Sequence, residues 1–172
     1  MRRAPGEGCR ALPRHRPRHD PQHREHPCPG APVMSYDNLP PDPILPVLTD
    51  LNRPFWEGCA QGKLLLQRGK TSRQLRYPAA LVCPFTLDPE YEWEEMSGRG
   101  KIFTYVVFDR VYHKSWEGRT PYTVALVELD EGPMMLTNIV GLDRNELEIG
   151  RAVQVDFEPL ADGIAKPVFK PV

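Results

Sequence analysis

From residue 94 to the C-terminus, short runs rich in β-branched and aromatic residues alternate with turns made of Gly, Pro and Asp. Runs of this length and spacing are typical of a small barrel or sandwich. Glu131-Gly132-Pro133 predicts a tight hairpin turn, and residues 144–150 predict a short helix or turn. The expected strands are residues 101–111, 122–129, 134–140, 152–157 and 167–169. A mainly β chain of this kind is compatible with a five-stranded OB-fold barrel over residues 94–172, although periodicity alone also allows other small barrels.

Two shorter segments precede the expected barrel. Residues 34–63 carry apolar side chains at helical steps, and Pro46 and Pro54 interrupt them, so two short helices are expected there rather than one long helix. Residues 64–93 begin with a strand-like run at 64–68 and continue through turns to Tyr91. The apolar positions of the helical pattern are Ile44, Leu48, Leu51, Phe55 and Cys59.

Residues 1–33 form a positively charged tail rich in Pro, Arg and His. Seven Arg against three acidic residues give +4, whereas the remaining 15 basic and 20 acidic residues give −5. Such a composition buries too little apolar surface to offset chain entropy, so we expect a disordered tail, with Met34 as a candidate start. The interleaved prolines argue against metal binding by His15, His19, His23 and His26.

The chain carries no sequence signal for a membrane or an oxidising compartment. Its longest apolar run falls well short of the roughly 20 residues that a membrane helix needs. No apolar signal-peptide core follows the basic start, and the four cysteines do not have the spacing of a disulfide framework. We therefore expect a cytoplasmic protein without membrane contact.

Several phrases occur together in an order that resembles one family. They are Pro54-Phe55-Trp56-Glu57-Gly58, residues 62–68, Arg76-Tyr77-Pro78, Cys83-Pro84, residues 92–105, Pro121-Tyr122, residues 127–132 and residues 167–171. Over residues 43–172 the chain resembles the acyl-CoA-associated OB-fold proteins with an N-terminal rubredoxin-like zinc ribbon, the domain of unknown function 35 family. The resemblance implies short helices, a ribbon at residues 64–93 and an OB barrel.

The same resemblance implies that the chain functions in a complex with another protein. Family members associate with thiolase-like proteins of the lipid-transfer-protein aldolase type, or with hydratase-like proteins, in lipid and steroid degradation. The resemblance thus implies a non-catalytic accessory subunit that binds or positions acyl-CoA for its partner.

The chain departs from the family at the zinc site. Two Cys-x-x-Cys knuckles would fall at Gly69 and Ser72 and at Cys83 and Thr86, and only Cys83 is a cysteine. Structural zinc needs about four ligands, mainly thiolate or imidazole. We therefore predict a ribbon-shaped segment without zinc and without another cofactor, held by packing. The candidate packing residues are Leu75, Tyr77, Leu81, Phe85 and Trp93.

The strongest concentration of charge is residues 63–76, here called the basic segment, which has five cations and no acidic residue. Arg and Lys suit phosphate oxygens, so this segment is a candidate for the phosphates of coenzyme A. An acidic partner surface or plain solvation explains it equally well. The candidate residues are Lys63, Arg68, Lys70, Arg73 and Arg76, with Arg99 in the Ser97-Gly98-Arg99-Gly100 turn.

Aromatic side chains cluster near the end of the first long strand. Tyr105, Tyr112, His113 and Trp116 are candidates for an acyl or adenine surface, because OB folds stack flat ligands on such rings; core packing is the competing interpretation. His113 is the one histidine after residue 33, and no second catalytic group is placed beside it by sequence spacing. The chain therefore shows no catalytic set of its own.

Two other functions stay open at this point. OB folds and ribbons also bind nucleic acids, but the acidic balance after residue 33 argues against it, since nucleic-acid binders usually carry a basic surface. An independent enzyme is the third possibility. Recovery of a thiolase-like subunit with the chain would separate the accessory function from both.

Overall fold

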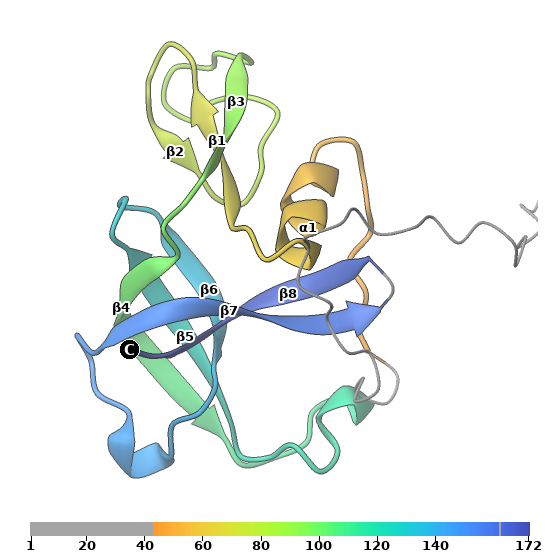
Figure 1. The fold of residues 1–172 in the computed structure, drawn as a ribbon, viewed down its shortest axis with the longest axis vertical. Coiled ribbons are helices and arrows are strands. Elements are labelled where there is room, and N and C mark those ends of the chain that lie inside the picture. Colours follow the sequence, from red (N-terminus) through yellow and green to blue (C-terminus); the bar gives the residue numbers. More distant parts are fainter. Residues whose placement is uncertain (1–42, 162) are drawn as a thin grey trace, which may run out of the picture.

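The computed structural model describes residues 43–161 and 163–172, and the tail predicted at 1–33 lies outside them. Figure 1 shows a small sheet standing on a barrel, with one helix beside both. The elements in chain order are α1 (Arg53–Ala60), β1 (Leu65–Gly69), β2 (Leu75–Arg76), β3 (Tyr91–Glu95), β4 (Arg99–Phe108), the 3-10 helix η1 (Lys114–Trp116), β5 (Tyr122–Leu129), β6 (Met134–Ile139), the 3-10 helix η2 (Arg144–Glu146), β7 (Ala152–Ala161) and β8 (Ile164–Pro171).

The last five strands close into a barrel in the order β4-β5-β6-β8-β7. All neighbours are antiparallel except β6 and β8, and β7 returns to β4 to complete the ring. This is the five-stranded Greek-key barrel of the OB fold, so the predicted fold is confirmed. Alternation places one face of each strand inside, as in β5, where every second residue from Thr123 to Leu129 is buried.

Closure of the barrel depends on a glycine. At Gly100 an added Cβ would lie 2.5 Å from the backbone oxygen of Glu128, so only glycine lets β4 and β5 approach this closely. Gly100 pairs with Val153 of β7 on its other side. The Ser97-Gly98-Arg99-Gly100 segment therefore lets β4 pack closely between β5 and β7 where the chain enters the barrel.

One hydrophobic core joins the helix, the small sheet and the barrel. Phe55 and Cys59 of α1 and Leu66 of β1 belong to the same buried cluster as Val127 and Phe169 of the barrel. Helix α1 contacts β8, β1 and β7, which fixes the small sheet to the barrel. Pro54 lies in the first turn of α1 as predicted.

Several predicted boundaries need correction. Between residues 43 and 63, the described part of the predicted helical segment, one α-helix forms where two were expected, because residues 43–49 have no regular structure and Pro46 disfavours helix at the residue before it. The predicted strand 101–111 runs from Arg99 to Phe108, 152–157 extends to Ala161, and 167–169 extends over Ile164–Pro171 because β7 and β8 pair along their length. None of the helices in residues 43–161 and 163–172 is long and apolar enough to cross a bilayer.

Candidate functional site

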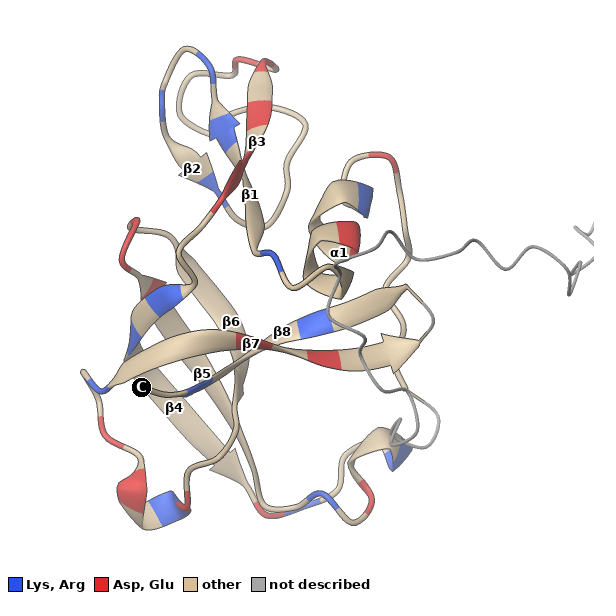
Figure 2. Cartoon of the chain, viewed as in Figure 1, with Lys and Arg blue, Asp and Glu red and all other residues tan. Residues whose placement is uncertain are grey.

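The small sheet has the order β2-β1-β3, with both pairs antiparallel. This arrangement brings the basic segment on β1 and its turn against the acidic strand β3, as the interleaved blue and red of Figure 2 show. Four cations of the basic segment pair with four glutamates, and we call this set the ion-pair ladder. Its pairs are Lys63–Glu95 (3.1 Å), Arg68–Glu94, Lys70–Glu90 (3.0 Å) and Arg73–Glu92 (2.8 Å).

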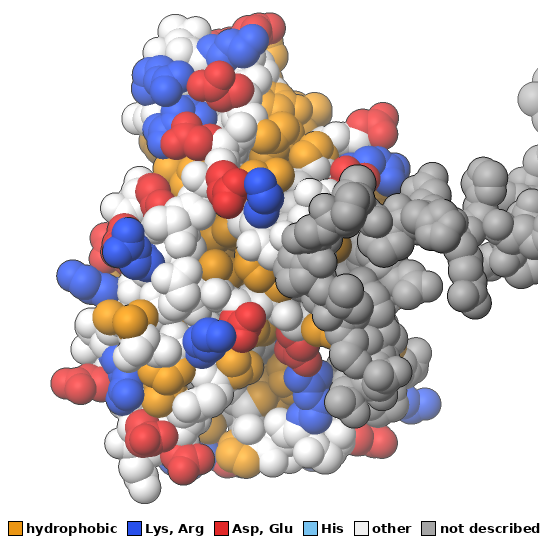
Figure 3. All heavy atoms as spheres, in the orientation of Figure 1, with side chains coloured by type: hydrophobic (Ala, Val, Ile, Leu, Met, Phe, Trp, Pro, Cys, Tyr) orange, Lys and Arg blue, Asp and Glu red, His pale blue; other side chains and the backbone are white. Residues whose placement is uncertain are grey.

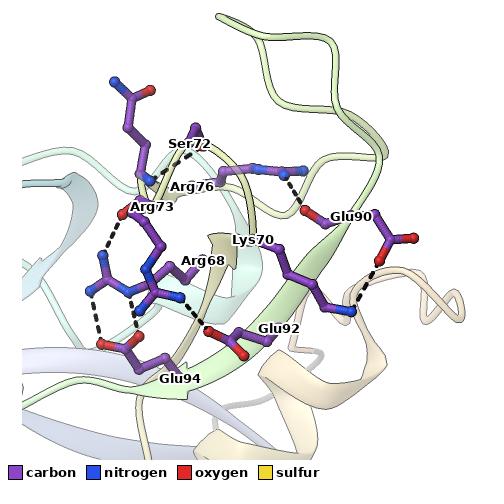
Figure 4. Close-up of polar contacts among 9 residues, drawn as sticks. Arg68, Lys70, Ser72, Arg73, Arg76, Glu90, Glu92 and Glu94 are labelled. Carbon is purple, nitrogen blue, oxygen red and sulfur yellow. Dashed lines mark hydrogen bonds and ion pairs between the residues drawn. The ribbon is translucent and has the colours of Figure 1, made fainter.

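The Arg68–Glu94 pair is the most buried of the ladder. Arg68 Nε and Nη2 donate to the two carboxylate oxygens of Glu94, the Nη2 bond being 2.8 Å, and Nη1 donates to the carbonyl of Arg73. The hydrogen bond from Arg68 lowers the pKa of Glu94, so this carboxylate stays ionised. Figure 4 shows Arg68, Lys70 and Arg73 directed at glutamates.

Arg76, the fifth cation, points inward and is only 5% exposed. Its guanidinium donates to the carbonyls of Glu90 (3.1 Å), Asp88 (3.4 Å) and Ala80 (3.5 Å), and lies 5.6 Å from the centre of the Tyr91 ring. Arg76 therefore organises the chain between β2 and β3.

These contacts change what the basic segment offers to a ligand. A phosphate approaching Lys63, Arg68, Lys70 or Arg73 meets a cation that already holds a carboxylate, and Arg76 is covered. Arg99 lies apart from the small sheet, at the start of β4, where it is exposed and pairs with Gln154 through the backbone. Nucleic-acid binding would face the same competition from the glutamates. The predicted phosphate role of the six residues therefore stays a proposal.

The four positions predicted as former zinc ligands gather in one place. Cys83 Sγ lies 3.7 Å from Ser72 Oγ, and a Cβ added to Gly69 would lie 2.4 Å from the same oxygen. Hydrogen bonds from the Thr86 side chain and the Phe85 backbone lower the pKa of Cys83 to about 6. One thiol, two hydroxyls and a glycine do not make a zinc site. Among the described residues, no group of three or more metal-ligating side chains occurs.

The four residues of the predicted aromatic surface pack in different ways, although Tyr112 and Trp116 are joined by ring contacts through Phe108 and Tyr122. Tyr105 packs on the core and donates from its hydroxyl to the Leu147 carbonyl (3.0 Å), whereas Tyr112 is exposed. Trp116 stacks on Tyr122 with ring centres 3.9 Å apart. His113 accepts the Ser115 backbone N–H at Nδ1 (3.2 Å) and caps η1. Tyr105 and Trp116 thus do not share one binding face.

A polar pocket beside Trp116 was missed by the sequence analysis. Its volume is about 210 Å³, and Arg119, Glu158 and Lys166 lie in its wall. Glu158 pairs with Arg119 and with Lys166 (3.0 Å), and both cations lie about 5 Å from the Trp116 ring. Burial lowers the pKa of Lys166, opposed by Glu158. These residues are far apart in sequence, so no spacing signalled the pocket.

The residues expected to pack the ribbon behave in two ways. Leu75, Tyr77 and Trp93 contact the core as predicted. Leu81 and Phe85 were placed there wrongly, since both are exposed. Arg76 and Gln67 occupy the interior instead: the Gln67 side-chain oxygen accepts the Ala80 N–H (2.9 Å). Figure 3 shows hydrophobic side chains gathered on the small sheet beside α1.

The chain is similar in sequence to several known proteins. Residues 93–158 match the family model of the ChsH2 C-terminal OB-fold domain. The chain is 36% identical over 118 residues to a probable enoyl-CoA hydratase alpha subunit of Thermomonospora curvata, with 68% of this chain and 36% of the relative covered. It is 33% identical over 133 residues to the 3-oxo-4,17-pregnadiene-20-carboxyl-CoA hydratase alpha subunit of Mycobacterium tuberculosis, with 74% and 42% covered. The chain thus spans about two fifths of these relatives.

Two shorter relatives are covered much further. A DUF35 domain-containing scaffold protein of Methanocaldococcus jannaschii is 31% identical over 96 residues, with 55% of this chain and 67% of the relative covered. The solved structure of the Ltp2-ChsH2(DUF35) aldolase contains a chain that is 33% identical, with a TM-score of 0.68 and with 74% of this chain and 98% of that chain covered. The small sheet, the OB barrel and these matches together show that the chain belongs to the DUF35 family.

Proposed function

We propose that this chain is a non-catalytic accessory subunit that helps a thiolase-like or hydratase-like partner act on an acyl-CoA. The observation that carries the proposal is the match to the DUF35 chain of the Ltp2-ChsH2(DUF35) aldolase, 98% of which this chain covers at 33% identity. Similarity to two hydratase alpha subunits, one of them a 3-oxo-4,17-pregnadiene-20-carboxyl-CoA hydratase subunit, supports an acyl-CoA substrate of lipid or steroid degradation.

The chemistry of the described residues supports an assisting role. A catalytic histidine needs a reacting group beside it and a third group to orient the ring. His113 Nδ1 has Ser115 Oγ at 2.9 Å, but the same nitrogen accepts the Ser115 backbone N–H, so the pair forms the local cap of η1. His113 therefore has a structural role at the start of η1, which accounts for the contacts of its ring.

The finer parts of the proposal concern ligand, metal and compartment. Lys63, Arg68, Lys70 and Arg73 contact CoA phosphate only if the phosphate displaces glutamates of the ion-pair ladder. Arg76 would first have to leave its covered position, whereas Arg99 is exposed and lies outside the ladder. The chain works without zinc, because the four knuckle positions supply a single thiol. The cytoplasm suits Cys59 and Cys83, two buried free thiols.

Affinity purification from the native host tests the proposal. The tagged chain is expected to retain a thiolase-like or hydratase-like subunit, identified by mass spectrometry. The assembled complex should turn over an acyl-CoA, and the chain alone should show no thiolase, aldolase or hydratase activity. Recovery of nucleic acid without such a subunit, or turnover by the pure chain that is lost in His113→Ala, would contradict the proposal.

A further inference from the structure

The chain between β2 and β3 presents an unusual surface. Residues 77–87, here called the apolar loop, contain no charged residue, although 26% of the whole chain is charged. Three of its large side chains are mostly exposed: Leu81 (71%), Phe85 (76%) and Leu87 (74%). Contiguous apolar side chains left in water mark contact surfaces in soluble proteins.

The apolar loop is held in shape from inside. Arg76 and Gln67 bind the Ala80 backbone, the Cys83 N–H donates to the Asp88 carbonyl (2.9 Å), and the Leu87 N–H donates to the Cys83 carbonyl (2.8 Å). A surface that is ordered before binding loses little conformational entropy when a partner docks. These hydrogen bonds therefore hold the backbone that carries the exposed side chains.

Leu87 has an unusual backbone conformation, which Arg73 (φ +56°) shares at the matching place in the other turn. Its φ of +57° lies in the left-handed region, which favours glycine and costs other residues about 1–2 kcal/mol. The side chain that carries this cost points into solvent. Because the two turns share this conformation, the strain belongs to the fold of the small sheet, and what distinguishes Leu87 is its exposed apolar side chain.

Phe85 projects from the apolar loop and makes its surface uneven. Its side chain lines two hollows. One, of about 380 Å³, is mostly apolar and is lined also by Tyr77 and Pro78. The other, of about 300 Å³, reaches Pro133 of the barrel hairpin and has Arg68, Arg73 and Glu131 in its wall. The apolar hollow beside the exposed Phe85 ring suits interdigitation with apolar side chains of a protein. Aromatic anchors in such settings supply much of the binding energy at protein interfaces.

We propose that the apolar loop, through Leu81, Phe85 and Leu87, is the docking surface for an uncharged apolar patch on the thiolase-like or hydratase-like partner subunit. This inference rests on the proposed function. Charge favours this occupant over a membrane, because membrane-surface segments carry free Lys or Arg beside their apolar residues. Here the loop is followed by Asp88 and Glu90, and Lys70 is already paired with Glu90.

The test uses the full chain and the partner subunit recovered by the purification described above. The double variant Leu81→Ser/Phe85→Ser is expected to bind the purified partner at least about tenfold more weakly, as hot-spot truncation does. Leu87→Gly removes the side chain and relieves the left-handed strain, so it should weaken binding while its thermal midpoint stays equal or rises. Ile149→Ser, an equally exposed apolar residue on the barrel side, is the matched control and should bind as the parent does.

The outcomes separate the two proposals. If a thiolase-like or hydratase-like subunit is recovered and both loop variants bind it like the parent, the docking inference is wrong and the proposed function stands. If no such subunit is recovered, both fail. Loop-dependent sedimentation with phosphatidylcholine–phosphatidylserine vesicles would assign the loop to a membrane. Loop-dependent self-association in the ultracentrifuge would assign it to a second copy, and either result overturns the inference.

Discussion

At the scale of single residues, buried polar groups do more for the small sheet than its exposed charges. Exposed ion pairs contribute about 0–1 kcal/mol each, so most of the ion-pair ladder contributes little alone. Arg76 differs because its guanidinium is covered and donates to three carbonyls, two of which, those of Asp88 and Glu90, also accept a backbone N–H. Arg76 therefore links β2 to the chain before β3 from inside the small sheet.

Replacing Arg76 should be far more costly than replacing its neighbour on the surface. Arg76→Gln is expected to lower the free energy of unfolding by about 2 kcal/mol, because the hydrogen bonds that a covered, charged guanidinium donates to three carbonyls are lost. Denaturant unfolding measures the change. Arg73→Gln, which loses one exposed pair, is the control and should change it by less than about 1 kcal/mol.

Cys59 makes stability depend on alkaline pH. Burial in α1 raises its pKa from 9.0 to about 12. A thiol whose folded pKa lies above its unfolded value contributes stability that is complete below pH 9 and is lost as pH rises toward 12. The denaturant midpoint of the parent should therefore fall across this window. In Cys59→Ala the midpoint should fall less steeply; equal slopes would show that other groups, such as Tyr77, cause the loss.

At the scale of elements, the small sheet brings together the two turns that carry the predicted zinc-ligand positions. The β1–β2 turn carries Gly69 and Ser72, and the loop before β3 carries Cys83 and Thr86, so two separate turns still meet. The meeting is now stabilised by a thiol–hydroxyl contact, Arg76 and Gln67. We therefore expect the frame of the apolar loop to hold without metal.

Restoring the ligands should restore metal binding. The parent is expected to hold no stoichiometric zinc, whereas Gly69→Cys/Ser72→Cys/Thr86→Cys, which leaves Cys83 in place, should hold about one zinc per chain, since four thiolates suffice for a structural site. Elemental analysis after dialysis is the measurement. Zinc in the parent at one per chain, or none in a folded triple variant, would contradict the prediction.

The barrel was easier to predict than the site, for physical reasons. The strand at 122–129 was predicted to the residue because its alternation of buried and partly exposed positions is a local pattern. The neutralisation of the basic segment was not predicted, because Arg68 and Glu94 are 26 residues apart and meet only through the β1–β3 register. Leu81 and Phe85 were assigned to the interior from hydrophobicity, which does not distinguish a core from a contact surface.

At the scale of the whole molecule, one shared core makes the helix, sheet and barrel a single unit, and residues 1–33 stand outside the described structure. Because the composition of that segment predicts a tail without packing, its removal should leave the body intact.

Deletion of residues 1–33 is therefore expected to shift the thermal midpoint by less than about 3 °C, which for a chain of this size corresponds to under roughly 1 kcal/mol. Calorimetry of the deleted and full chains compares them directly. A larger fall would show that the tail packs on the body.

The ion-pair ladder also bears on how fast subunits meet. Long-range attraction between unpaired charges accelerates encounter and makes the association rate constant depend on ionic strength. With its cations matched by glutamates, the small sheet exerts little such attraction at a distance. Association should then proceed at the unsteered rate of about 10⁵–10⁶ M⁻¹s⁻¹ and change little with salt. Discrimination between partners would reside in the lifetime of the complex, since related interfaces differ mainly in dissociation rate.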